Sequence, residues 1–138
     1  FRSNKVRPGT MLVHPRGKDA LTLFTVEERM AMIQHTTKNL KNVTVASWSG
    51  LLGDYCKQND AQTIVKGLRA VTDFDYELQM AQINFQTAGI ETMFMATAPA
   101  HSFLSSSIVK ELAHYGGDIS TMVPPNVKSE LAKRVARK

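Results

Sequence analysis

Residues 63–85 read T-I-V-K-G-L-R-A-V-T-D-F-D-Y-E-L-Q-M-A-Q-I-N-F and change from a strand pattern to a helix pattern within a few positions. The β-branched run at the start predicts a strand over 62–66 that ends at Lys66. The pair Thr72-x-x-Asp75 predicts the start of a helix. Apolar side chains then line one helix face at Phe74, Leu78, Ala81 and Phe85. We therefore expect a strand, a short turn and a helix in direct succession.

The rest of the chain repeats this alternation of strands and helices. Further strands are predicted over 11–14, 43–47 and 91–97, and further helices over 25–39, 51–59, 105–115 and beyond 125. Thr25-Val-Glu-Glu28 has the form of a capping box for the first of these helices, and Gly116-Gly117 supplies a stop for the helix over 105–115. Such alternation favours parallel strands joined by right-handed crossovers, and hence a doubly wound, mainly parallel α/β sheet. We expect a single domain over 1–138, with 1–18 unassigned and a basic helix or tail over 126–138. Ligands of such sheets bind outside the carboxyl ends of the strands.

Composition places the chain among soluble globular proteins. Hydrophobic residues make up 43% of the 138 positions and charged residues 21%, as in ordinary folded domains. No apolar run is long enough to span a membrane, and no secretory leader pattern opens the chain. The one cysteine, Cys56, is expected to be a buried thiol on a helix, which is typical of a reduced cytoplasm.

The formal net charge of +5 comes from the two ends of the chain. Residues 1–18 carry five cations and no acid, residues 126–138 carry five cations and one acid, and 19–125 therefore sum to −4. Cations at the ends without interleaved aromatic residues favour solvated termini over a nucleic-acid interface. We expect neither nucleic acid nor membrane as a partner.

Two cations surround a glycine where the 62–66 strand is expected to end. Gly67 would let the backbone turn sharply and approach an anion, while Lys66 and Arg69 supply a point charge and a planar fork suited to phosphates. The alternative is a pair of solvent-facing cations beside an ordinary turn. Glu77, one turn into the following helix, could face the same site.

A second candidate anion site lies at the predicted start of the 105–115 helix. Ser105, Ser106 and Ser107 place hydroxyl and backbone N–H groups where the helix dipole is positive. Ordinary helix capping is the alternative, since one serine is enough for it. His101 lies in the loop before this helix and is the histidine we retain as a candidate. No side-chain nucleophile or paired carboxylates are evident, so the pattern favours phosphate chemistry by positioning and charge stabilisation.

The ordered segments resemble the phosphopantetheine adenylyltransferase family of the nucleotidyltransferase superfamily, in its actinobacterial form. The matching stretches include F-T-V-E-E-R (24–29), G-L-L-G-D-Y (50–55), I-V-K-G-L-R to Q-I-N (64–84) and S-F-L-S-S-S (102–107). The resemblance implies a Rossmann-like fold. It also implies adenylyl transfer from ATP to phosphopantetheine with Mg²⁺, giving dephospho-coenzyme A and pyrophosphate. It further implies a cytoplasmic homohexamer with coenzyme A as a possible feedback ligand.

The resemblance also implies roles for individual residues. Arg69 and Ser106 take the catalytic positions, and Lys66, Leu52, Thr10 and Lys18 the phosphopantetheine side. The ATP side comprises Gly67, Leu68, Arg69, Glu77, His101, Ser102, Phe103, Leu104, Ser105, Ser106 and Ser107. The resemblance implies no protein-held metal site.

One part of the family pattern is incomplete. The family carries P-G-[ST]-F-D-P-x-T-x-G-H near its start, whereas here Pro8-Gly9-Thr10 is followed by M-L-V-H and no T-x-G-H occurs. His14 is a weak substitute, because its spacing differs and no glycine precedes it. We therefore expect the N-terminal βα portion to be truncated, and keep a catalytically impaired, ligand-binding form as the alternative function.

Overall fold

The computed structural model describes residues 9–14 and 23–136, with the side chains of 71–73 excepted. Two compact units divide the chain: residues 1–49 with 107–138, and residues 50–106. We refer to them as unit 1 and unit 2 and describe each by itself. The single domain expected over 1–138 stays a prediction.

Unit 1 contains a parallel strand pair. Strand β1 (Gly9–Val13) pairs with β2 (Val43–Ser47) from Gly9↔Val43 to Val13↔Ser47. β2 has the predicted bounds, whereas β1 begins two residues earlier than expected and ends one residue before His14. The helices of this unit are α1 (Val26–Thr37), most of α4 (Ser106–His114) and α5 (Pro125–Val135). Its buried apolar side chains are Val13, Val109, Ile119 and Leu131.

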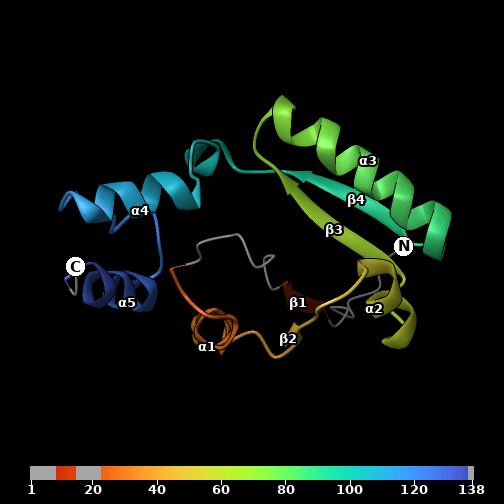
Figure 1. Cartoon of the computed structure of the whole chain (residues 1–138), viewed down its shortest axis with the longest axis horizontal. Coiled ribbons are helices and arrows are strands. Elements are labelled where there is room, and N and C mark those ends of the chain that lie inside the picture. The colour runs from red at the N-terminus through yellow and green to blue at the C-terminus, as the bar shows by residue number, and fades with distance from the viewer. Residues whose placement is uncertain (1–8, 15–22, 137–138) are drawn as a thin grey trace. The chain divides into compact units, whose positions relative to one another are not determined.

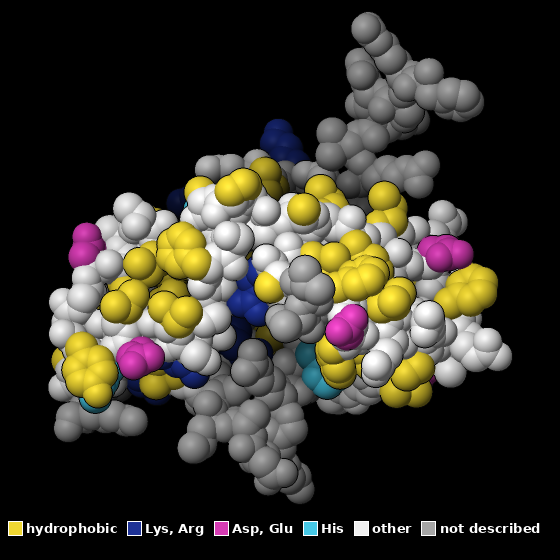
Figure 2. All heavy atoms as spheres, turned by 90° about the horizontal axis from the view of Figure 1, so that it is seen from above, with side chains coloured by type: hydrophobic (Ala, Val, Ile, Leu, Met, Phe, Trp, Pro, Cys, Tyr) yellow, Lys and Arg dark blue, Asp and Glu magenta, His cyan; other side chains and the backbone are white. Residues whose placement is uncertain are grey.

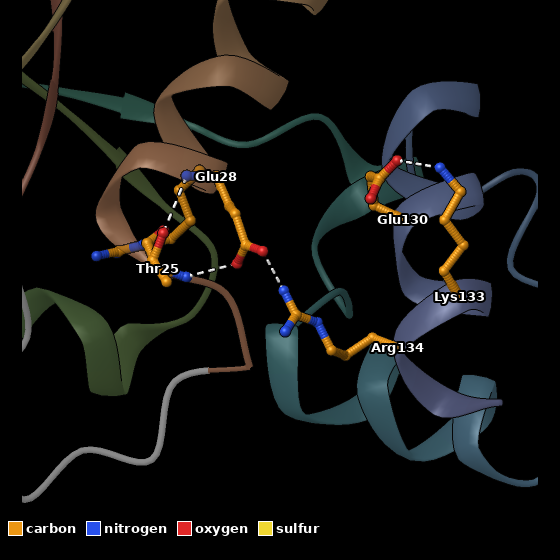
Figure 3. A network of polar contacts seen from close by, with 6 residues as sticks. Thr25, Glu28, Glu130, Lys133 and Arg134 are labelled. Atoms are coloured by element: carbon orange, nitrogen blue, oxygen red, sulfur yellow. Dashed lines mark hydrogen bonds and ion pairs between the residues drawn. The ribbon is translucent and has the colours of Figure 1, made fainter. Parts of the chain in front are cut away.

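The start of α1 is fixed by the capping box that the sequence predicts. The Thr25 hydroxyl accepts the Glu28 N–H at 3.2 Å, and the Glu28 carboxylate accepts the Thr25 N–H at 2.8 Å. Two otherwise unpaired N–H groups are thereby satisfied. The second Glu28 oxygen accepts from Arg134 of α5, so the cap also ties the first helix to the last one (Figure 3).

Unit 2 is built around a second parallel pair. Helix α2 (Leu52–Gln58) precedes β3 (Thr63–Leu68), and α3 (Val71–Ala88) crosses to β4 (Glu91–Ala96), with α3 lying along one face of the two strands (Figure 1). A 3₁₀ turn, Pro99–His101, follows β4. The helix stop at Gly89 has the left-handed φ of 70°, a conformation that glycine adopts without strain.

Three details of this unit differ from the sequence prediction. β3 continues to Leu68, because Gly67 and Leu68 still pair with β4. α3 begins at Val71 with Ala70 as its N-cap, so Thr72 lies inside the helix and is not its cap. Phe85 is 54% exposed, and Asn84 is the buried residue of that turn.

The two faces of the β3–β4 pair have different surroundings. Alternation along a strand places Lys66 and Phe94 on the face that α3 covers, and Phe94 meets Phe74 of α3 edge-on at 5.6 Å. Val65, Met93 and Met95 alternate with them and are each about 60% exposed. The described strands therefore form two parallel pairs. The parallel pairing and the alternation of elements confirm the α/β class.

Charges near the C-terminus are neutralised locally. Among the described residues of 126–138, Lys128 pairs with Asp118, Lys133 with Glu130, and Arg134 with Glu28.

Figure 2 shows hydrophobic side chains interspersed with polar ones on the surface seen from above. Within the described part of the chain, no helix has the length and hydropathy needed to cross a membrane.

Candidate functional site

The carboxyl ends of β3 and β4 bring the two main candidate segments of unit 2 together. Leu68 and Ala96, the last residues of the strands, are partners in the register. The N–H of Thr97 donates to the Leu68 carbonyl oxygen at 2.8 Å and extends the pairing by one residue. Arg69 and the loop that starts at Ala98 therefore leave the sheet at the same edge, where ligands of parallel sheets bind.

Arg69 is fixed directly to the loop before α4. Its Nη1 donates to the Leu104 carbonyl oxygen at 2.7 Å. The loop is itself held by a bond from Leu104 N to His101 O at 3.1 Å and one from Ser102 Oγ to Pro99 O at 3.0 Å. A guanidinium carries five N–H donors in a planar fork, and this contact uses one of them to orient the side chain.

Lys66 lies within β3 and under α3, not in a turn beyond the strand. Its Nζ is 3.3 Å from Glu77 Oε2, and the two side chains are 37% and 23% exposed. Glu77 Oε2 is buried and makes no hydrogen bond of acceptable geometry. The contact is an ion pair across the interface of strand and helix, and the sequence prediction did not pair these two residues.

Gly67 has no left-handed backbone, so the predicted sharp turn at this residue is wrong. Among described residues, only Gly89 and Gly116 are glycines with positive φ. A Cβ at position 67 would meet only Thr97 Oγ1, at an ordinary 3.8 Å. Neither conformation nor packing among the described residues therefore requires glycine at position 67.

A cytidylyltransferase-like family model matches residues 10–112 of the chain. A phosphopantetheine adenylyltransferase from Streptomyces coelicolor is 55% identical over 113 residues, which cover 82% of this chain and 71% of that protein. The chain belongs to the phosphopantetheine adenylyltransferase family. Proteins of the same name from Frankia casuarinae (52% identity, 87% and 76% covered) and Thermobifida fusca (51%, 83% and 70%) are similarly related.

The remaining family positions of unit 2 lie around the same strand edge or close to it in sequence. Leu68 ends β3 and is half-buried. His101 and Ser102 are exposed, Phe103 is 58% exposed, and Leu104 and Ser105 are half-buried. Ser106 is the last residue of unit 2 and the first of α4. Leu52 begins α2, and Ser107 belongs to unit 1.

The family positions of unit 1 are placed less favourably for a ligand. Thr10 is the second residue of β1, and its hydroxyl lies 3.0 Å from that of Thr44 on β2. Thr10 therefore lies near the amino end of the β1–β2 pair, whereas ligands of parallel sheets bind at the carboxyl ends. His14 directly follows β1 at the carboxyl edge, and its carbonyl oxygen accepts from Arg29 Nη2 at 3.3 Å. Lys18 lies outside the described residues.

The sequence analysis does not identify Thr97 or the Lys66–Glu77 pair as parts of this strand edge. Thr97 closes the strand pair and is the nearest neighbour of a Cβ at position 67. The feature that could have indicated Thr97 is its position at the end of the predicted strand, where Arg69 follows the neighbouring strand. The Lys66–Glu77 pair had a signal too, since strand alternation places Lys66 on the same face as Ile64, and Ile64 is buried.

Two other kinds of site can be compared with this strand edge among the described residues. No group of three or more His, Cys, Asp or Glu side chains there could hold a metal ion. A surface hollow on α3 is lined by Gln79, Gln82, Ile83 and Gln86 and includes none of the family positions.

Proposed function

We propose that the chain catalyses adenylyl transfer from ATP to phosphopantetheine. A phosphate oxygen of phosphopantetheine attacks the α-phosphorus of ATP, the bond from that phosphorus to the α,β-bridging oxygen breaks, and pyrophosphate leaves. The products are dephospho-coenzyme A and pyrophosphate. The observation that carries the proposal is the Arg69–Leu104 contact, which joins the two family segments most specific for this chemistry at one strand edge.

Each cation serves a different substrate in this proposal. Lys66 binds the phosphate of phosphopantetheine, and Arg69 binds the phosphates of ATP and stabilises the charge of the transferring group. Gly67 lets the ATP approach the backbone, and the start of α4 at Ser106 adds N–H donors. Leu52 lines the pantetheine side, while the adenine side comprises Leu68, His101, Ser102, Phe103, Leu104, Ser105 and Ser107.

Mg²⁺ enters this proposal as a partner of ATP. Magnesium commonly binds through substrate phosphates with few protein ligands, and this fits a strand edge without a carboxylate cluster among its described residues. When bound, the ion would offset the negative charge of the phosphates. The chain's own part is to bind and orient the two substrates through Lys66, Arg69 and backbone N–H groups.

We further propose a cytoplasmic homohexamer, with coenzyme A as a feedback ligand. The support for assembly is the exposed apolar side chains on the outer side of α3, Tyr76 at 64% and Ile83 at 52% exposed. Surfaces of this kind mark interaction sites. Light scattering of the purified chain tests the mass, and a monomer at micromolar concentration would contradict it.

Pyrophosphate release tests the reaction, with ATP, Mg²⁺ and phosphopantetheine given to the purified chain. Arg69→Ala should lower turnover about 10²–10³-fold, as for loss of one charge-stabilising donor. Lys57→Ala is the matched control, since Lys57 is another cation of unit 2 that donates to a backbone carbonyl, that of Thr87 at 3.0 Å. Equal activity of both variants would remove Arg69 from the mechanism.

Lys66→Ala separates the two substrates. If Lys66 binds the phosphopantetheine phosphate, the variant should raise the KM for phosphopantetheine and leave the KM for ATP nearly unchanged. The reverse pattern would mean that the roles of Lys66 and Arg69 are exchanged.

A catalytically impaired, ligand-binding form is the second candidate. It is favoured by the absence of T-x-G-H from the sequence, in which Pro8-Gly9-Thr10 is followed by M-L-V-H. This form predicts that ATP and phosphopantetheine bind in calorimetry without pyrophosphate release. Turnover at an ordinary enzymatic rate would exclude it, and His14→Ala would then show whether His14 replaces the motif histidine.

A further inference from the structure

We infer that Glu77 is a positioning residue that acts on phosphopantetheine through Lys66. Its carboxylate holds the Lys66 ammonium against α3, so that the cation is already in one position before the substrate phosphate binds. This inference rests on the proposed function, and it differs from the direct contact of Glu77 with ATP that the family resemblance implies.

The geometry supports a role through Lys66. Lys66 is in the middle of a paired strand, opposite Phe94, and its side chain emerges on the face covered by α3. An aromatic pair, Phe74 and Phe94, lies beside this point with ring centroids 5.6 Å apart. A lysine ammonium in such partly apolar surroundings needs a counter-charge, and Glu77 supplies one at 3.3 Å.

The same pair is a weak device for stability alone. An ion pair whose side chains are 37% and 23% exposed contributes little, because desolvation offsets much of the attraction. Glu77 Oε2 is buried and forms no hydrogen bond that would improve this balance. What the pair does achieve is restriction of a long, flexible lysine side chain, and such restriction lowers the entropic cost of binding a phosphate.

A matched control lies on the same helix. Asp75 is two residues before Glu77 and exposed, so its side chain is on another part of α3. Asp75→Asn removes the same charge from the same helix turn without touching the Lys66 contact. A general effect of helix charge would appear in both variants, whereas positioning of Lys66 would appear only in Glu77→Gln.

Isothermal calorimetry with phosphopantetheine and with ATP, each alone, tests the inference. Glu77→Gln should weaken phosphopantetheine binding about tenfold, a coupling of the size found between contacting residues, and change ATP binding less than twofold. In a Lys66→Met background the same change should have no further effect on phosphopantetheine. Glu77→Asp, which keeps the charge on a shorter side chain, should give an intermediate loss and serves if the glutamine variant does not fold.

The outcomes separate this inference from the proposed function. Wild-type chain that binds neither substrate would overturn both. Wild-type binding with Glu77→Gln equal to Asp75→Asn would overturn only the positioning role. Tighter phosphopantetheine binding in Glu77→Gln would also overturn it, because Glu77 would then compete with the phosphate for Lys66. A selective loss of ATP binding would establish the direct nucleotide contact in its place.

Discussion

Gly53 of α2 lies against Ala88 of α3 so closely that a Cβ at position 53 would be 2.6 Å from the Cβ of Ala88. Real Cβ atoms essentially never approach other heavy atoms to this distance. Gly53 is also buried. This close approach sets how tightly the short helix α2 packs on the end of α3, next to the start of β4.

Gly53→Ala should therefore destabilise unit 2. Alanine favours the helix by up to about 1 kcal/mol over glycine, but overpacking at a fixed contact costs about 1–3 kcal/mol. We expect a net loss of about 1–2 kcal/mol in the free energy of unfolding, measured by urea denaturation. Gly9→Ala is the control, since a Cβ at Gly9 meets nothing within 4 Å. Equal stability of the two variants would show that the helices can move apart at no cost.

Thr25→Ala tests the cap of α1. The variant loses the hydroxyl that accepts the Glu28 N–H, and loss of an N-cap costs about 0.5–2 kcal/mol. Thr37→Ala makes the same chemical change at the other end of α1, where the hydroxyl donates to the Ile33 carbonyl oxygen of the same helix and alanine is the better helix former, and it should cost clearly less. A ranking in the opposite order would mean that Arg134, which also binds Glu28, holds the helix start without Thr25.

Cys56 should behave as a reporter of unfolding. The residue is 3% exposed on α2, and burial raises the pKa of its thiol. Little thiolate is therefore present at neutral pH, and a thiol reagent in solution has poor access to it. A thiol reagent should label the native chain slowly and the urea-unfolded chain at the rate of a small thiol. Rapid labelling without urea would mean that α2 opens locally far more often than the rest of unit 2 unfolds.

Asp118 should give a local dependence of stability on acid. Hydrogen bonds from the Ser120 hydroxyl and N–H, together with Lys128, lower the pKa of Asp118 from 3.8 to about 2. A carboxyl whose pKa is lowered by folding stabilises the protein above its unfolded pKa, and this contribution is lost as pH falls toward the folded pKa. The melting-temperature difference between wild type and Asp118→Asn should therefore be constant above pH 5 and shrink between about pH 4 and pH 2. A constant difference down to pH 2 would contradict the shift.

Local signals in the sequence predicted most of the elements. The capping box at Thr25, the β-branched run of β2 and the glycine stop at Gly116, whose φ is 75°, each act within a few residues, and the structure confirms all three. The parallel pairing of β3 with β4 followed from their alternation with α3. The buried thiol of Cys56 was likewise expected and is confirmed.

The differences arise where a partner strand or helix decides the outcome. Pairing with Met95 and Ala96 extends β3 through Gly67 and Leu68, although glycine is a poor strand former. Asn84 is buried and Phe85 exposed because the face of α3 that meets the strands is set by packing, not by hydropathy alone. Strand alternation in the sequence places Lys66 on the same face as Ile64, but the helix rotation that turns Glu77 toward Lys66 is set by packing.

Gly67→Ala separates the fold from the site at the glycine that lies between the two cations in the sequence. A Cβ there finds space, with only Thr97 Oγ1 at 3.8 Å, and alanine loses less entropy than glycine in a strand by about 0.5–1 kcal/mol. Stability should therefore stay equal or rise slightly in urea denaturation, in contrast to Gly53→Ala. If the ATP phosphates approach this backbone, the added methyl should raise the KM for ATP or lower turnover by about tenfold, as for a small misplacement of the reacting groups. An active, unchanged enzyme would mean that no substrate comes close to Gly67, and an unstable one would mean that β3 has less space than its contacts indicate.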